Sequence, residues 1–204
     1  MNNTIQKNRQ TFVIQALNAG LVKATHAFSI MTGSPVKMNP AVLANLSSEE
    51  NFSGEKEPGA ILYVLTTQLI GEVNGKSYLV MTEKECNALV RALHKNQLPE
   101  EDSLKEAFLL ELDNIISASV ISALSDALKI EIYGDVPQVK KMPSAALRNF
   151  ISTDKDPKET ASMLVTRTLF TLDKIQEVSP LFIWKLSPSI LEAVPPSAPS
   201  LQNR

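Results

Sequence analysis

The chain has 204 residues, of which 44% are hydrophobic and 21% charged, and its formal net charge is −2. This length suits one domain with tails, and the composition is that of a folded globular protein rather than a disordered one. The slightly acidic balance argues against nucleic-acid binding, which requires clustered Lys and Arg. Cys86 is the single cysteine, so the chain has no internal disulfide framework.

The N-terminal segment, residues 1–10, is polar and lacks the apolar core of a signal peptide. We expect this segment to be flexible. Ser, Asp, Lys and Glu interrupt each apolar run of the chain before it reaches the length that spans a bilayer. These features predict a cytoplasmic protein without membrane insertion.

The first half of the chain predicts a long helix, a short strand, a loop and a hairpin. Apolar residues have helical spacing from Thr11 to Met31, and Gly33 is a plausible stop. Asn74-Gly75 is a strong hairpin signal, because both residues tolerate positive φ. The other expected elements are a strand at 36–38, a polar loop at 39–59, strands at 60–69 and 76–81, and a helix at 83–93.

The second half predicts the same order of elements. Ser103 and Glu106 form a capping-box pattern at the start of a helix that can continue to about Leu128. After residue 187 the segment 188–204 is rich in proline and has no apolar periodicity, so we expect a disordered tail. The other expected elements are a strand at 130–133, a polar loop at 143–157, and strands at 161–172 and 181–186.

A shift of 96 positions aligns the two halves of the chain. Internal duplication is the economical interpretation. We therefore predict an α+β fold in which duplicated helix–strand–hairpin halves, 11–95 and 103–187, build one domain over 11–187. Long helices would pack on a mainly antiparallel sheet. The matched pairs are Phe12 with Phe108, Asn18 with Asn114, Ala27 with Ala123, Ser29 with Ser125 and Val36 with Ile132.

Two polar residues of the second long helix stand on one face. Glu111 and Asn114 are three positions apart, so their side chains share a face of the helix. The other residues of that face are all small, which would let a partner approach closely: Ala107, Ala118, Ser122 and Ser125. By composition alone, Glu111 and Asn114 are simply part of an ordinary solvated face.

The segment 111–116, followed by 129–132, resembles the Glu-x-x-Asn helix and short strand of the CheC, CheX and FliY family of chemotaxis phosphatases. Residues 71–75 and 79–81 resemble the central hairpin of that family. The resemblance covers roughly residues 11–187 and implies a CheC-like domain.

This resemblance implies a reaction. In such phosphatases the helix docks on a receiver domain that is phosphorylated on aspartate. Carried over to this chain, Asn114 would orient the attacking water, and Glu111 would pair with a lysine of the receiver's active site. The implied partner is a phosphorylated CheY-type response regulator in chemotaxis signalling. Mg²⁺ would belong to that receiver, so this chain would need no metal or cofactor of its own.

The first helix departs from the family pattern. Gln15 stands at the position of the acid and Asn18 at that of the amide. Glutamine can hydrogen-bond a lysine but cannot form an ion pair with it, so we interpret this helix as a degraded second site. On the second helix, Ala107 replaces the Ser or Asp that family members often carry. Asp113 points toward the apolar side of that helix, where a buried hydrogen bond could accommodate it.

Two further interpretations stay open. The chain could be a catalytically silent CheC-like module that binds a receiver, a motor protein or another signalling protein. It could also be a structural protein that uses the same fold without either interface. Family members form monomers or strand-paired dimers, so the resemblance leaves open a monomer or a homodimer.

Overall fold

The computed structural model describes residues 2–43, 59–93, 102–153, 164–175 and 178–196. Five helices and eight strands form within these ranges. The helices are α1 (Asn2–Thr32), α2 (Glu83–Leu93), α3 (Asp102–Leu128), α4 (Ser144–Thr153) and α5 (Ser189–Glu192). The strands are β1 (Val36–Met38), β2 (Val42–Leu43), β3 (Ile61–Gly71), β4 (Gly75–Thr82), β5 (Ile132–Gly134), β6 (Gln138–Pro143), β7 (Leu164–Leu172) and β8 (Leu181–Leu186).

All the strands belong to one antiparallel sheet with the order β1-β7-β8-β4-β3-β5. The two long hairpins, β3–β4 and β7–β8, meet through β4 and β8 at the centre of the sheet. The short strands change sides. β1 and β2 of the first half pair with β7 of the second, whereas β5 and β6 of the second half pair with β3 of the first. Each half therefore completes the sheet of the other.

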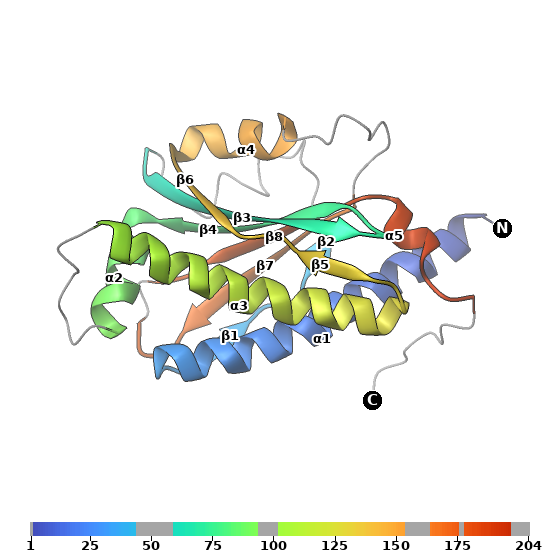
Figure 1. Ribbon diagram of the computed structural model, residues 1–204, viewed down its shortest axis with the longest axis horizontal. Helices are drawn as coiled ribbons and strands as arrows, with labels where there is room; N and C mark the ends of the chain where they lie inside the picture. The colour runs from blue at the N-terminus through green and yellow to red at the C-terminus, as the bar shows by residue number, and fades with distance from the viewer. Residues whose placement is uncertain (1, 44–58, 94–101, 154–163, 176–177, 197–204) are drawn as a thin grey trace.

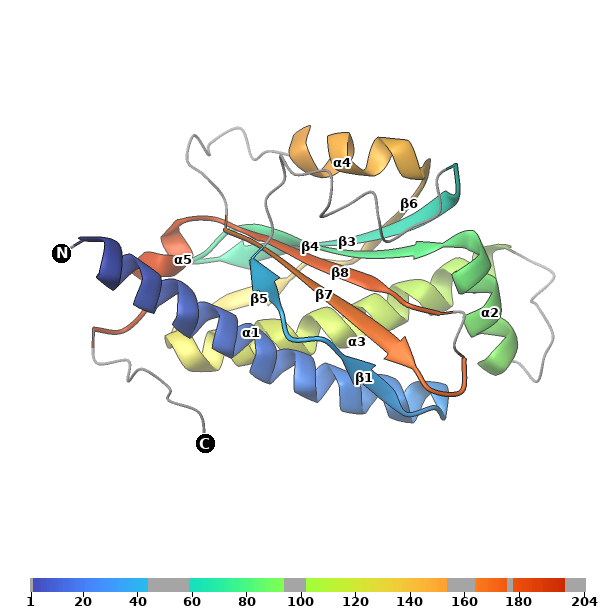
Figure 2. The ribbon, with the colours of Figure 1, turned by 180° about the vertical axis from the view of Figure 1, so that it is seen from behind.

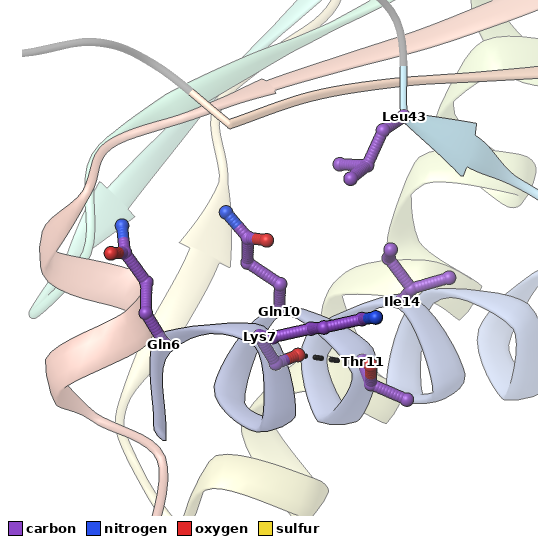
Figure 3. A pocket seen from close by; sticks show the side chains of 6 residues that line it. All are labelled: Gln6, Lys7, Gln10, Thr11, Ile14 and Leu43. Atoms are coloured by element: carbon purple, nitrogen blue, oxygen red, sulfur yellow. Dashed lines mark hydrogen bonds between the residues drawn. The ribbon is translucent and has the colours of Figure 1, made fainter. Parts of the chain in front are cut away.

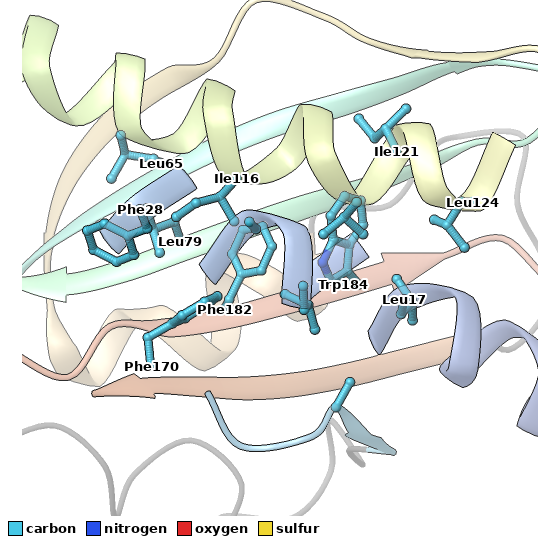
Figure 4. Close-up of a cluster of buried hydrophobic side chains, with 14 of the residues drawn as sticks. Leu17, Phe28, Leu65, Leu79, Ile116, Ile121, Leu124, Phe170, Phe182 and Trp184 are labelled. Atoms are coloured by element: carbon cyan, nitrogen blue, oxygen red, sulfur yellow. The ribbon is translucent and has the colours of Figure 1, made fainter. Parts of the chain in front are cut away.

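The helices cover the two faces of the sheet unequally. The long helices α1 and α3 lie side by side across one face, and α4 lies on the opposite face (Figures 1 and 2). Between α1, α3 and the sheet lies the larger core, where Trp184, Phe182 and Phe170 stack edge to face with centroid distances of 5.4 and 6.3 Å (Figure 4). This core fixes which side of α3 remains exposed.

The two long helices touch at a glycine. A Cβ at Gly20 of α1 would lie 2.5 Å from the Cα of Val120 and 3.1 Å from the Cβ of Ala123 on α3. Any side chain at position 20 would force the helices apart. Contrary to the expectation from the sequence that no apolar run reaches membrane-spanning length, α3, alone among the described helices, is long and apolar enough to span a membrane by length and composition. Its apolar residues pack against α1 and the sheet, as in the core helix of a globular protein.

The duplicated architecture is confirmed in detail. Both long helices end at a left-handed residue, Gly33 in the first half and Lys129 in the second, each with φ of 59° and 96 positions apart. After the short strand, the Asn39 N–H donates to Leu169 O at 2.9 Å, and the Asp135 N–H donates to Gln68 O at 2.8 Å. Residues 39 and 135 are again 96 positions apart, so the same turn is built twice.

Both ends of the domain differ from the sequence-based prediction. Residues 2–10 are helical and belong to α1 rather than to a flexible segment. The segment after Pro188 is also ordered: it forms α5, with Ile190 fully buried and Val194 4% exposed in the larger core. Two apolar side chains anchor this segment, which is otherwise rich in proline, so composition alone pointed to disorder. The last predicted tail residues, 197–204, lie outside the described residues.

One local prediction was wrong, and another was confirmed with a difference in its turn. Part of the predicted loop 143–157 is α4, whose Leu147 and Ile151 are spaced by one turn and are buried against the second face of the sheet. The hairpin between β3 and β4 forms, but Gly75 already pairs with Leu69 and does not have positive φ. Gly71 instead has a φ of 122°, and a Cβ there would lie 2.2 Å from Glu131 O.

Because Ile190 is fully buried, we expect Ile190→Ala to lower the free energy of unfolding by about 2–4 kcal/mol, through lost burial and the cavity left behind. Urea denaturation followed by circular dichroism measures this change. Glu192→Ala alters an exposed residue of the same helix and serves as the matched control, with an expected change under about 0.5 kcal/mol. Small, equal effects of both variants would contradict the packing of α5.

Candidate functional site

The candidate site lies on the solvent-exposed face of α3. Glu111 and Asn114 are both exposed, as are their small neighbours Ala107, Ala118 and Ser122. The opposite side of the helix is anchored in the larger core, with Leu109, Leu112, Ile116 and Val120 fully buried. The structure therefore brings the predicted acid and amide together on one open, smooth face. Between Ala107 and Ser122 the other exposed residues of α3 are small, so a partner surface can approach both groups closely.

The equivalent amide on α1 is already in use. The Oδ1 of Asn18 accepts a hydrogen bond of 2.8 Å from the N–H of Ala41, in the connection between β1 and β2. Asn18 is half-buried, and Ala41 is 5% exposed. This amide is therefore a structural group that satisfies a buried backbone donor.

A proline prevents the same bond in the second half. The shift of 96 positions that relates the two turns places Pro137 where the first half has Ala41. Proline has no backbone N–H, so residue 137 cannot donate to Asn114 as Ala41 donates to Asn18. The amide of Asn114 is left exposed and available for another partner. Sequence reasoning missed this pair, although the spacing that aligned Asn18 with Asn114 also aligns Ala41 with Pro137.

The rest of the α1 face is also less open than that of α3. Gln15 is half-buried, in contrast to the exposed Glu111. Val22 and His26 occupy the positions of Ala118 and Ser122, and Val22 is 60% exposed. The structure thus places Gln15 and Asn18 on one helix face, as predicted, but gives that face a bulkier surface and an occupied amide.

Asp113 faces the sheet, whereas Glu111 and Asn114 face solvent. It is fully buried, and its Oδ2 accepts a 2.6 Å hydrogen bond from the Thr67 hydroxyl on β3. Its Oδ1 has no partner among the described residues. Burial raises the pKa of Asp113 to about 7, and the bond from Thr67 opposes part of that rise. The buried hydrogen bond considered for this residue in the sequence therefore exists.

Charged groups cluster at the start of α3. Lys141 on β6 pairs with Asp102 at 3.3 Å and with Glu106 at 3.2 Å. Lys105 pairs with Asp102 at 3.1 Å. The two lysines hold the pKa of Asp102 below its usual range through hydrogen bonds and charge. The two pairs made by Lys141 fasten the first turns of α3 to the sheet, about two to three turns before Asn114.

A hollow of about 420 Å³ lies elsewhere, between the N-terminal part of α1 and β2 (Figure 3). Its lining is Gln6, Lys7, Gln10, Thr11, Ile14 and Leu43. None of the four predicted site residues lines it, so the candidate site is an exposed helix face and not a cavity. The described residues contain no cluster of three or more His, Cys, Asp or Glu side chains that could hold a metal ion.

Comparison with known proteins relates this geometry to chemotaxis. No family model matches the chain. The CheY-P phosphatase CheC of Bacillus subtilis is 24% identical over 147 residues, which cover 67% of this chain and 68% of CheC. Thermotoga maritima FliY has the same fold, with a TM-score of 0.65 at 14% identity, over 91% of this chain and 93% of that one.

A second structural relative is seen with a partner. CheX of Borrelia burgdorferi, in a complex with CheY, BeF₃ and Mg²⁺, matches 82% of this chain and 96% of its own with a TM-score of 0.54 at 13% identity. The predicted fold class is therefore confirmed, and the predicted resemblance extends from short motifs to the whole domain.

Asn18 and Asn114 should respond differently to truncation. Asn18→Ala leaves the Ala41 N–H buried without an acceptor, so we expect the free energy of unfolding to fall by about 1–3 kcal/mol. Asn114→Ala alters an exposed side chain and should change it by less than about 0.5 kcal/mol. Urea denaturation of both variants measures the difference. Equal losses would contradict the assignment of Asn18 as the structural amide.

Proposed function

Because this chain is a CheC-like protein, we propose that it is a cytoplasmic phosphatase that dephosphorylates the phospho-aspartate of a CheY-type receiver domain. The observation that carries the proposal is the amide of Asn114, exposed beside Glu111 on a face whose other exposed residues between 107 and 122 are small. The similarity in sequence to a CheY-P phosphatase supports the choice of substrate.

The reaction is hydrolysis of an acyl phosphate. A water oxygen forms a bond to phosphorus while the bond from phosphorus to the aspartate oxygen breaks, giving inorganic phosphate and a free carboxylate. Phosphoryl transfer depends mainly on positioning and electrostatics, so one well-placed amide can accelerate it. Asn114 would enter the receiver's active site and hold the water in line with the breaking bond.

Glu111 would fix the docking of the two proteins. It lies one turn before Asn114 on the same exposed face, so both side chains can reach one site on the partner. Its carboxylate would pair with the lysine of the receiver's active site, and this charge-assisted contact would orient the helix. Mg²⁺ would be held by the receiver, where it neutralises charge on the phosphoryl group.

The first helix would contribute little to this reaction. Its amide is bonded to Ala41, and releasing Asn18 would leave a buried N–H unpaired. Gln15 also lacks the charge that an ion pair with a lysine requires. The chain would therefore act through one working surface, on α3.

Asn114→Ala should reduce the dephosphorylation rate by roughly 10²–10³-fold, a barrier increase of about 3–4 kcal/mol. The measurement is phosphate release from a phosphorylated receiver with Mg²⁺, corrected for the receiver's own rate. Asn18→Ala is the matched control and should keep most of the activity where its circular dichroism spectrum is native. Loss of most activity in Asn18→Ala alone would reverse the assignment of the two helices. A parent chain that binds the phosphorylated receiver without accelerating hydrolysis would favour the silent binding module.

Pro137→Ala tests why Asn114 is free. The substitution supplies a backbone N–H where the first half has the donor of the bond to Asn18. If this N–H captures the amide of Asn114, phosphate release should fall by roughly 5–10-fold, since the amide must break a hydrogen bond of about 1 kcal/mol to act. Pro143→Ala, at an exposed proline of β6, is the control and should retain the parent rate. Equal rates for the two variants would mean that Pro137 has no part in keeping Asn114 free.

A further inference from the structure

A buried acid lies directly behind the candidate site. Asp113 stands between Glu111 and Asn114 in the sequence of α3, yet it is fully buried and faces β3. Thr67 donates a 2.6 Å hydrogen bond to its Oδ2, while Oδ1 has no partner among the described residues. The turn that presents the two exposed groups is thus joined to the sheet through one carboxyl group.

The duplicated fold provides an internal comparison for this acid. By the shift of 96 positions, Leu17 of α1 is the residue equivalent to Asp113 of α3. The bond from Asn39 to Leu169 in one half corresponds to the bond from Asp135 to Gln68 in the other. The preceding residues, Thr168 of β7 and Thr67 of β3, are therefore equivalent. Leu17 is fully buried in the larger core, and the hydroxyl of Thr168 is buried with no hydrogen-bond partner in the part of the chain that the structure describes. The fold therefore accepts a leucine at this position, and a carboxyl group is not needed to build it.

Burying a carboxyl group without full hydrogen bonding opposes folding. Of the two long helices, α3, which carries the exposed Asn114, bears this cost at Asp113, whereas α1 has Leu17 at the equivalent position. The surroundings of Asp113 offer its carboxyl group little further hydrogen bonding. Thr67 belongs to a row of residues that are neighbours across adjacent strands, which continues through Ser77 and Trp184 to Thr166. Three polar atoms of this row, Ser77 Oγ, Trp184 Nε1 and Thr166 Oγ1, are also buried without a partner among the described residues.

We propose that Asp113 is a positioning residue: its neutral carboxyl group clamps the site-bearing turn of α3 to Thr67, and its ionisation loosens that turn. The proposal rests on the function proposed above for Glu111 and Asn114. A charged carboxylate with one hydrogen bond would have to draw in water or move away from β3. Either response would shift the turn that carries Asn114, and a displacement of about 1 Å can cost a large factor in rate.

Burial is the cause of the raised pKa of Asp113, and the hydrogen bond from Thr67 opposes it. The charged groups on the elements around Asp113 do not account for the rise. β3 and β5 contain no Asp, Glu, Lys, Arg or His. On β6, the ammonium groups of Lys140 and Lys141 lie over the rings of Phe150 and Tyr63. The charged residues of α1 and α2 are Lys7, Lys23, His26, Glu83, Lys84 and Arg91, all exposed, with Arg9 half-buried and Glu85 bonded to Thr82 and Ser179.

The direction of the pH effect follows from the raised pKa. The folded state binds the proton of Asp113 up to about pH 7, whereas an unfolded aspartate loses it near pH 4. Stability from this group is therefore complete below about pH 4 and is lost as the pH rises through 7. If only the neutral form holds the turn, activity should fall by up to about 30-fold between pH 6 and pH 8.5, the ratio of the protonated fractions.

The experiment compares the parent with Asp113→Asn and Asp113→Leu. Asparagine retains an acceptor for Thr67 but does not titrate. The rate of Asp113→Asn relative to the parent should therefore rise with pH, and the pH dependence that remains in this variant should be that of the receiver itself. Leucine copies the first half of the fold, so Asp113→Leu should unfold at a higher urea concentration than the parent yet dephosphorylate the receiver more slowly. Thr67→Val should also slow the reaction, whereas Thr168→Val, its counterpart in the first half, should not.

Parallel pH profiles for the parent and Asp113→Asn would overturn the proposal, as would a parent rate in Asp113→Leu at every pH. Hydrogen exchange separates this result from failure of the proposed function. If the parent releases no phosphate above the receiver's own rate, the protection of backbone amides 111–118 from hydrogen exchange still tests whether Asp113 clamps the turn. Protection that falls between pH 6 and pH 8.5 in the parent but not in Asp113→Asn supports the clamp, and equal behaviour of the two proteins rules it out.

Discussion

The exchange of short strands between the two halves is the constraint on which the rest of the domain depends. β1 and β2 lie on β7, and β5 and β6 lie on β3, so neither half can complete its own sheet edge. The exchange also brings α1 and α3 onto the same face, where Gly20 lets them touch. The position and rotation of α3 are therefore set by contacts from both halves, and its outward face is fixed as a consequence.

Duplication supplied two helices with the same amide, and small local differences separate their roles. In one copy a backbone N–H takes the amide of Asn18 into the fold. In the other copy a proline offers no such donor, and the amide of Asn114 faces solvent. The buried residue behind each amide differs as well, Leu17 in the first copy and Asp113 in the second. One half thus uses its amide within the fold, while the other half leaves its amide exposed.

Periodicity predicted the elements that depend on local pattern. The apolar spacing of α3 identified its buried side, and the exposed face with Glu111 and Asn114 follows from it. Contacts between distant segments were not predictable in this way. The bond from Ala41 to Asn18 joins residues 23 positions apart, and the packing of Ile190 joins the end of the domain to its core. Such contacts depend on which segments the fold brings together. For the same reason, a prediction from composition assigned α4 to a loop and α5 to a disordered tail.

The divided edges of the sheet have a consequence for self-association. Long, regular edge strands invite another chain to add a strand, and this is a route to aggregation. Here the edges consist of short pieces: β1 and β5 have three residues each and β2 has two. The longest piece, β6, has six residues and carries Lys140, Lys141 and Pro143. Charge and proline both oppose the addition of a further strand, so the exchange that builds the domain also protects its borders.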